Sequence, residues 1–314
     1  MRIIASAVVA FAVLVAGHSV VAAEPPTAIA AEAKFLPDNC QLLGVVRVEQ
    51  LLKSPAFQLL VKEAPLVARE EKAIAANLPL PLDQIDRIVL GGGVMGEEEG
   101  LFVIRTRATI LPETVAWSTS RVDPPKKVKV GKDDKYDLYQ RRHESYCVVG
   151  ENLLVFGKES ALRAVLARDA APALSAHLAT ALKDADLMAT VAFALDVESV
   201  RNKRRSEPAP FIPGLQVARV EAATDSLALT VKFGDQIEVS AVARATAADK
   251  SEKLTDEAKA FAAFHQTSLK RDRGVPDEVL DIFKFNVAVE GKRVTASTKC
   301  TAAAVVRLLK SLSQ

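Results

Sequence analysis

One pattern constrains the fold more than any other: two short apolar runs followed by a helix, occurring twice. Residues 146–168 hold an apolar run, a polar turn, a second apolar run and a helical stretch, and residues 285–309 repeat that order. Apolar runs joined by a short turn such as Gly150-Glu151-Asn152 or Glu290-Gly291 predict a β-hairpin. The pattern predicts an α+β fold made of two similar halves by internal duplication, each an antiparallel sheet packed against helices.

Other segments match between the halves in the same order. Predicted strands at 86–90 and 101–107 correspond to residues 225–245, and the strand at 42–48 corresponds to 187–195. Few residues are identical, so the match is one of pattern. We predict a first α+β repeat over residues 36–169 and a second over 174–314, separated by a short Ala/Pro segment. The pattern leaves open whether the halves share one sheet.

Several further elements can be predicted. Ser54-Pro55 is a good N-cap and first-turn pair for a helix. The longest helix is expected over about 249–270, with an apolar stripe of Leu254, Ala258, Phe261, His265 and Leu269. The remaining expectations are a hairpin of 126–130 with 136–140, a helix over 196–205, and strands at 216–222, 227–233 and 237–243.

The N-terminus has the three parts of a secretory signal peptide. Met1-Arg2 is positive, Ile3–Val15 is apolar, and Val21–Ala23 ends in small residues. We predict a signal peptide over residues 1–23, a flexible tether over 24–35, and export to the periplasm or the extracellular space. The apolar run is too short to span a bilayer and no later stretch is long enough. The mature chain is therefore expected to lack a transmembrane segment.

Composition excludes some classes of partner. The chain has 41 Lys+Arg and 39 Asp+Glu, and removal of Arg2 leaves 40 basic residues, so the mature chain is nearly neutral. Non-specific nucleic-acid binding needs excess positive charge, and nucleic acid is thus an unlikely partner. Aromatic residues make up only 5% of the chain, which weakens a sugar-stacking role. Three cysteines, Cys40, Cys147 and Cys300, allow one disulfide with a free thiol or three free thiols.

No motif predicts a cofactor or a metal. Gly91-Gly92-Gly93 lies before another strand and lacks the following Lys-Ser/Thr, so close packing in a hairpin is favoured over a phosphate loop. His143, His177 and His265 have no metal-ligand spacing. Ser160 lies in GKESA, which is no nucleophile elbow, and is expected in the first turn of a helix.

A cysteine–histidine pair is the remaining catalytic hypothesis. On one extended strand, His143 and Cys147 would lie about 13 Å apart, too far for a hydrogen bond. His177 or His265 could approach Cys147 only through the tertiary fold. A buried structural cysteine is favoured, and His265 is expected to be a core residue. The sequence assigns no catalytic residue, and a non-enzymatic role is preferred.

Two basic clusters are the best places for an anionic partner to dock. The residues are Arg201, Lys203, Arg204 and Arg205 in one cluster, and Lys126, Lys127 and Lys129 in the other. Charge runs are usually solvated surface, and docking of an acidic protein or an anionic envelope component is the alternative.

Two stretches carry a resemblance to a known group of proteins. LPDNCQLLGVVRVEQLLKSPAF at 36–57 is a strand running into a Ser-Pro-capped helix, and ATAADKSEKLTDEAKAF at 245–261 begins the long helix after strands. Together with the signal peptide and the duplicated layout, they resemble exported proteins of environmental bacteria known as domains of unknown function. The resemblance implies the compartment and the general layout, and it carries over no functional residues.

These observations favour an exported, non-catalytic binding or interaction protein of the periplasm or cell envelope, which would present an exposed apolar patch or an open sheet edge. A carrier of an apolar or amphiphilic molecule is the second hypothesis and requires an internal cavity. The third is a hydrolase in which Cys147 or a serine meets His177 or His265.

Overall fold

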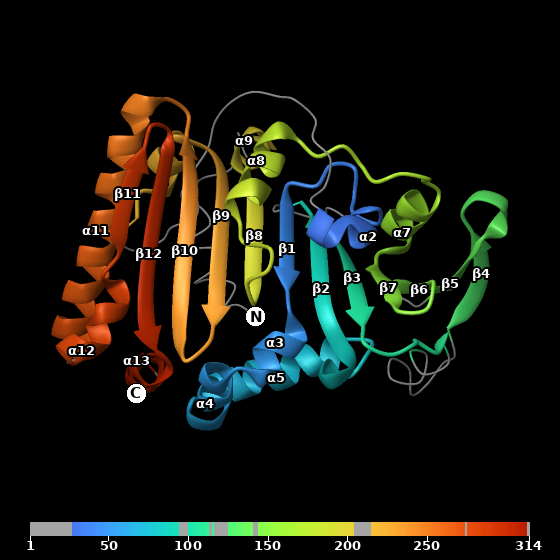
Figure 1. Cartoon of the computed structure of the whole chain (residues 1–314), viewed down its shortest axis with the longest axis horizontal. Helices are drawn as coiled ribbons and strands as arrows, with labels where there is room; N and C mark the ends of the chain where they lie inside the picture. The colour runs from blue at the N-terminus through green and yellow to red at the C-terminus, as the bar shows by residue number, and fades with distance from the viewer. Residues whose placement is uncertain are drawn as a thin grey trace.

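Both halves of the chain contribute strands to one twelve-stranded antiparallel sheet in the computed structural model (Figure 1). The structure describes residues 27–93, 100–112, 115, 125–140, 144–203, 215–273 and 275–312. The strand order is β11-β12-β10-β9-β8-β1-β2-β3-β7-β6-β5-β4. The α+β class and the antiparallel sheet are confirmed, and the halves share that sheet. The predicted signal peptide lies outside the described residues.

The first half follows the predicted order of elements. Ser54 caps α4 as expected, because its Oγ accepts a hydrogen bond from the backbone N–H of Phe57 at 3.3 Å. The helices are the 3-10 helix η1 (Thr27–Ile29), α2 (Ala30–Ala33), α3 (Val48–Lys53), α4 (Pro55–Glu63), α5 (Pro65–Asn77), η2 (Leu82–Gln84), η3 (Lys132–Asp134) and α7 (Glu159–Leu166). The strands are β1 (Leu42–Val46), β2 (Ile85–Gly92), β3 (Leu101–Thr106), β4 (Lys126–Val130), β5 (Tyr136–Gln140), β6 (Ser145–Val149) and β7 (Leu153–Gly157).

The second half differs from expectation at one element. The predicted strand at 216–222 is wrong: these residues form the helix α10 (Val217–Glu221), because Val217 and Val220 lie three residues apart and both pack into the core. The other helices are α8 (Ala176–Asp184), α9 (Val197–Lys203), α11 (Ala248–Arg273), α12 (Asp277–Leu280), η4 (Asp281–Phe283) and α13 (Ala302–Leu312). The strands are β8 (Val191–Asp196), β9 (Thr224–Phe233), β10 (Gln236–Ala245), β11 (Asn286–Glu290) and β12 (Arg293–Thr301).

The strand order is the same in both halves when it is followed outward from the sheet centre. The central strands β1 and β8 pair antiparallel. At one end of this pair the backbone N–H of Arg47 donates to the carbonyl of Thr190, and at the other end the N–H of Asp196 donates to the carbonyl of Gln41. From there the order is β1-β2-β3-β7-β6 on one side and β8-β9-β10-β12-β11 on the other. Among the described strands, only β5 and β4, at the outer edge of the first half, have no counterpart.

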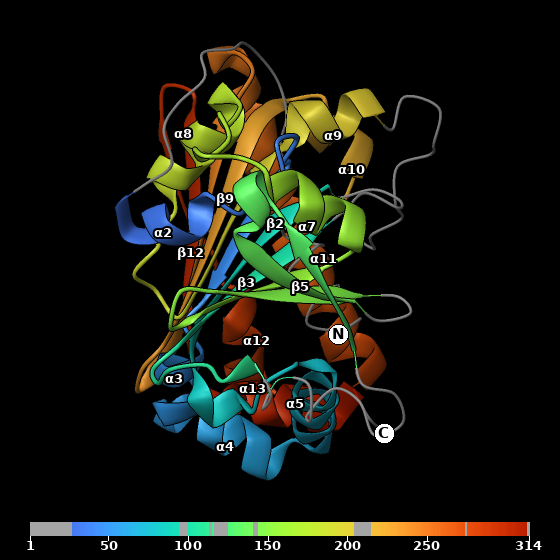
Figure 2. The ribbon, with the colours of Figure 1, turned by 90° about the vertical axis from the view of Figure 1, so that its right-hand side faces the viewer.

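The two faces of the sheet carry different helices. The face that we call face A bears Val45, Val103, Val155 and Ala192, which form one core cluster with residues of α2, α7 and α8. The opposite face, face B, packs against α9, α10 and α11 in the second half. Figure 2 shows α2 and α8 on one side of the sheet and α9, α10 and α11 on the other.

The segment before β1 is part of the fold. The prediction of a flexible tether over residues 24–35 is wrong for residues 27–35, which form η1 and α2 and continue into the core. Ile29, Ala33, Phe35 and Leu36 are all buried in the face A cluster. The Ala-rich composition suggested a loose segment, but these apolar side chains bury against the sheet.

A buried ion pair holds this segment to the sheet. Arg87 of β2 and Arg105 of β3 lie directly opposite each other, an arrangement of like charges that by itself destabilises a sheet. Oε1 of the buried Glu32 accepts hydrogen bonds from Nε of Arg87 at 2.8 Å and from Nε of Arg105 at 2.7 Å. Burial raises the pKa of Glu32, but the hydrogen bonds from Arg105 and Arg87 outweigh it, so the pKa is lowered overall.

A glycine makes room for the same segment. A Cβ on Gly91 would lie 2.6 Å from Cδ2 of Leu36 and 3.1 Å from Sγ of Cys40. Leu36 is fully buried in the face A cluster, where side chains are close-packed, so moving it away disturbs its neighbours. The interpretation of Gly91-Gly92-Gly93 as a site of close packing is thus confirmed at Gly91.

We predict that Glu32→Gln lowers the free energy of unfolding by about 3–5 kcal/mol at pH 7, because it leaves two partly buried guanidinium groups without a balancing charge. Glu32 has a folded-state pKa below its unfolded value, so its contribution is present above about pH 4.3 and is lost as the pH falls through the folded pKa. Urea unfolding of both proteins across pH 3–7 measures this. The prediction fails if the difference between the proteins does not shrink in acid. Glu49→Gln, at a solvent-exposed pair with Lys53, is the control and should have little effect.

We predict that Gly91→Ala lowers the free energy of unfolding by about 1–3 kcal/mol through overpacking. Leu36→Ala in the same chain should recover part of that loss, since it removes the atoms that the new Cβ meets. Chemical denaturation of the single and double variants gives the coupling energy. Gly100→Ala, whose nearest neighbour atom would lie at an ordinary 3.8 Å, is the matched control. Additive effects of the two substitutions would show that the contact is not the cause.

Candidate functional site

The two halves differ in where the helix after the last hairpin lies. In the first half α7 packs on face A, where Leu162 and Val165 join the cluster of Cys147 and Val155. In the second half α13 packs instead with α4, where Ala302 and Val306 meet Leu60 and Ile237. Among the described residues, α8 is the helix on face A of this half, and it lies over β8, β9 and the near side of β10. Figure 1 shows β10, β12 and β11 toward the viewer without a helix in front of them.

The residues on this uncovered part of face A are polar or small. We call it the open face, and it consists of Glu238, Ser240 and Arg244 on β10, Arg293, Thr295, Ser297 and Lys299 on β12, and Asn286, Ala288 and Glu290 on β11. Cross-strand partners within it include Ser240 with Ser297 and Arg244 with Arg293. The strands β7 and β6 have Leu153, Val155 and Cys147 in the equivalent places, beneath α7. The sequence of the second half is therefore suited to contact with water or a polar partner.

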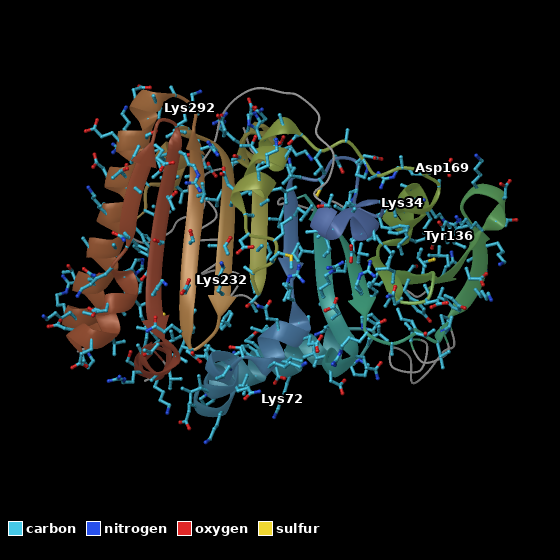
Figure 3. The ribbon with its side chains drawn as sticks, viewed as in Figure 1. Lys34, Lys72, Tyr136, Asp169, Lys232 and Lys292 are labelled. Carbon is cyan, nitrogen blue, oxygen red and sulfur yellow. The ribbon has the colours of Figure 1, made fainter. Side chains whose placement is uncertain are left out.

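One end of the open face carries two paired lysines. Lys232 lies 2.7 Å from Asp186, and Lys299 lies 2.7 Å from Glu238. The hydrogen bond from Lys232 lowers the pKa of Asp186, and the same bond raises the pKa of the lysine. In Figure 3, Lys232 and Lys292 mark opposite ends of these strands. The lysine end is charged but locally balanced.

The other end carries two opposed arginines. Arg244 donates from Nε and Nη2 to the two carboxylate oxygens of Asp184, at 2.6 and 2.7 Å, and Arg293 donates from Nε to Oδ1 of the same carboxylate at 3.2 Å. The hydrogen bond to Asp184 raises the pKa of Arg244. Asp184 is the last residue of α8, so one carboxylate ties this helix to β10 and β12. The arrangement can present guanidinium donors to an anionic group.

The structure does not bring the two predicted basic clusters together. Lys126, Lys127 and Lys129 lie on β4, the outermost strand at one edge of the sheet, whereas Arg201 and Lys203 lie on α9, which packs on β9. Arg201 donates to the backbone carbonyl of Glu221 at 2.8 Å. Arg204 and Arg205 lie outside the described residues. The five described residues therefore do not form one surface.

The lysines of β4 have a structural explanation. Lys127 and Lys129 both contact the carboxylate of Asp137 on β5, at 2.8 and 2.9 Å. An exposed edge strand can recruit the strands of other molecules, and lysines on the edge oppose that association. These lysines can protect the edge without binding a partner.

The proposed cysteine–histidine chemistry finds little support. Cys147 is buried, and burial raises the pKa of its thiol to about 12. Nε2 of His177 lies 3.1 Å from Oε2 of Glu198, and His265 packs among the rings of Phe261, Phe264 and Phe283. His143 lies outside the described residues. A buried, high-pKa thiol is a poor nucleophile.

Within the part of the chain that the structure describes, no three histidine, cysteine or acidic side chains gather in a way that could hold a metal ion. No described helix is long and apolar enough to cross a membrane.

Comparison with known proteins gives few matches. No family model and no curated protein matches the sequence. Crystal forms IV and III of TP0453 align over 90% of this chain and over 96% and 97% of theirs, with 10% and 12% identity and a TM-score of 0.47 in both cases. We transfer no property of TP0453 to this chain.

The sequence did not reveal Arg244, Arg293 or Asp184 as a cluster. Each looks like an ordinary charged residue at the end of a strand or a helix. The single available signal was the alternation of apolar and polar residues over part of residues 237–243, which indicates a strand with one solvent-exposed face.

We predict that Cys40 and Cys147 react with a thiol reagent at pH 8 at least a hundredfold more slowly in the folded protein than in the unfolded chain. Both are buried free thiols with a pKa of about 12, so the thiolate is scarce at this pH. Mass spectrometry after labelling, with and without guanidinium chloride, measures each site. Rapid native labelling of Cys147 would revive the hydrolase hypothesis. Cys300, which is less buried, provides the internal comparison.

Proposed function

We propose that this chain is an exported, non-catalytic binding protein of the periplasm or cell envelope that docks a polypeptide partner on its open face. The observation that carries the proposal is the missing cover on face A of the second half. The first half has Leu153, Val155 and Cys147 there, under α7. The equivalent positions of β12 and β11 are Arg293, Thr295 and Ala288.

The chemistry of the open face supports a polypeptide rather than a sugar polymer. Its residues supply hydroxyl, amide, ammonium and guanidinium groups and the carboxylates of Glu238 and Glu290, and none of them is aromatic. Sugar-binding surfaces usually rely on stacking rings, which this face lacks. Arginine is enriched at protein–protein interfaces, where its planar donors meet carboxylates. An acidic polypeptide surface is the complement that these groups fit.

Export and duplication are parts of the same proposal. The signal-peptide pattern of residues 1–23 supports export to the periplasm or the extracellular space. The shared order of five strands supports an internal duplication with repeats near 36–169 and 174–314. The helix before the first strand of each half, α2 or α8, lies on face A in both, so we extend the first repeat back to residue 27. A carrier role remains a hypothesis.

A photo-crosslinking experiment tests the docking face. We expect a benzoylphenylalanine at position 297 to crosslink one discrete polypeptide in cells that produce the protein, because Ser297 lies in the middle of the open face. The same residue at position 253, an exposed site on α11, should not crosslink that polypeptide. Identical products at both positions, or a product that resists proteases, would contradict a polypeptide partner on this face.

A negative charge added at the same place supplies a quantitative prediction. Ser297→Glu should weaken capture of the crosslinked polypeptide by about tenfold or more, because a carboxylate on the face repels an acidic partner. Pull-down at graded partner concentrations measures the change, and thermal unfolding verifies the fold. Lys253→Glu is the control with an added negative charge on α11. Equal binding by Ser297→Glu and the unchanged protein would eliminate the open face as the docking site.

A further inference from the structure

We infer that Arg244 and Arg293 form the point at which the open face takes a carboxylate of its acidic partner. This inference rests on the proposed function, because it needs the open face to be the docking surface. It goes further by naming the two side chains that recognise the partner and the chemical group that they bind.

The geometry of the pair leaves donors in reach of solvent. The two arginines lie directly opposite each other on β10 and β12. Each guanidinium has five N–H donors, and Asp184 accepts two from Arg244 and one from Arg293. The side chains of Arg244 and Arg293 are 35% and 32% exposed. A guanidinium group whose N–H donors reach solvent can bind a carboxylate through two parallel hydrogen bonds.

The first half contains a similar arginine pair in a closed form, on β2 and β3, although the second pair lies one strand further out, on β10 and β12. There Arg87 and Arg105 also lie opposite each other and share one carboxylate from a helix on face A, but their side chains are only 16% and 21% exposed and that of Glu32 is fully buried. The neighbouring strands of that half lie under α7, and no helix of the described residues takes its place over β12. The second pair is therefore the open member of two similar arrangements.

The charges around the open pair favour an anion. One further basic residue lies close by: Lys292, whose Nζ donates to the carbonyl of Thr246 at 2.8 Å and whose backbone carbonyl accepts from the N–H of Ala245. The nearby acidic groups are Asp184 and Glu290. Three basic residues thus lie near two acidic ones. Glu290 is 78% exposed and lies 3.9 Å from Nη1 of Arg293, which shows that a carboxylate can approach this guanidinium from solvent.

Neighbouring hydroxyls extend the site along the strands. Thr295 and Ser297 follow Arg293 at every second residue of β12 and so lie on the same face. Same-face residues of a strand are spaced by about 6.6–6.8 Å, which is also the spacing of alternate side chains in an extended peptide. An extended acidic segment can place one carboxylate on the arginine pair while its other polar groups meet these hydroxyls.

The test titrates the protein, labelled with ¹⁵N-arginine, with a synthetic hexaglutamate peptide. We expect saturable shifts of the Nε–Hε signals of Arg244 and Arg293 at constant ionic strength, and little shift with a hexaglutamine peptide of the same length. Arg293→Gln should weaken binding of hexaglutamate by about tenfold, while the two hydrogen bonds from Arg244 to Asp184 remain. Arg293→Lys keeps the positive charge but lacks the planar guanidinium group, so it should weaken binding less. Arg219→Gln, at an exposed arginine of α10, should bind like the unchanged protein.

Each other outcome overturns the inference. Saturable binding of inorganic phosphate without binding of hexaglutamate would assign the pair to a phosphate. Equal, non-saturating shifts at all exposed arginines would show only diffuse attraction. If Arg293→Gln leaves hexaglutamate binding unchanged while Ser297→Glu still abolishes partner capture, the inference fails and the docking face stands. If Ser297→Glu leaves partner capture unchanged, the docking face itself fails.

Discussion

A single buried carboxylate allows two arginines to face each other at the centre of the first half. Without Glu32, the guanidinium groups of Arg87 and Arg105 would oppose each other across β2 and β3, which a sheet tolerates poorly. Because Glu32 lies on α2, the same interaction fixes the residues before β1 over face A, where Leu36 fills the space above Gly91. The core cluster that extends from α2 through α7 to α8 depends on that placement.

The second half uses the same interaction and leaves it partly open. Asp184 balances Arg244 and Arg293 from the end of α8, but the helix that follows the last hairpin joins α4 instead of covering face A. The uncovered strands have Arg293, Thr295 and Ala288 where the first half has Leu153, Val155 and Cys147. One change in the path of a terminal helix thus turns a buried face into a surface that can receive a partner.

The described cysteine and histidine side chains that could have suggested catalysis are buried or packed against other side chains. Burial raises the pKa of the Cys147 thiol to about 12, His177 lies beside Glu198, and His265 packs among phenylalanine rings. The lysines on β4 balance Asp137 at a sheet edge that would otherwise be free to associate. These surroundings give each of these groups a structural role, and the binding role that we propose rests on the open face.

The sequence alone determined the local elements. Apolar periodicity and turn residues located both hairpin–helix units, the Ser54 cap and the long helix, because these depend on residues close together in the chain. It failed at residues 216–222 and 27–35, where contacts with distant strands decide the conformation. Only the tertiary structure decided that both halves share one sheet, that α13 leaves face A open, and that Asp184 joins Arg244 to Arg293. Those features pair residues about 50 to over 100 positions apart, and no local pattern encodes such pairs.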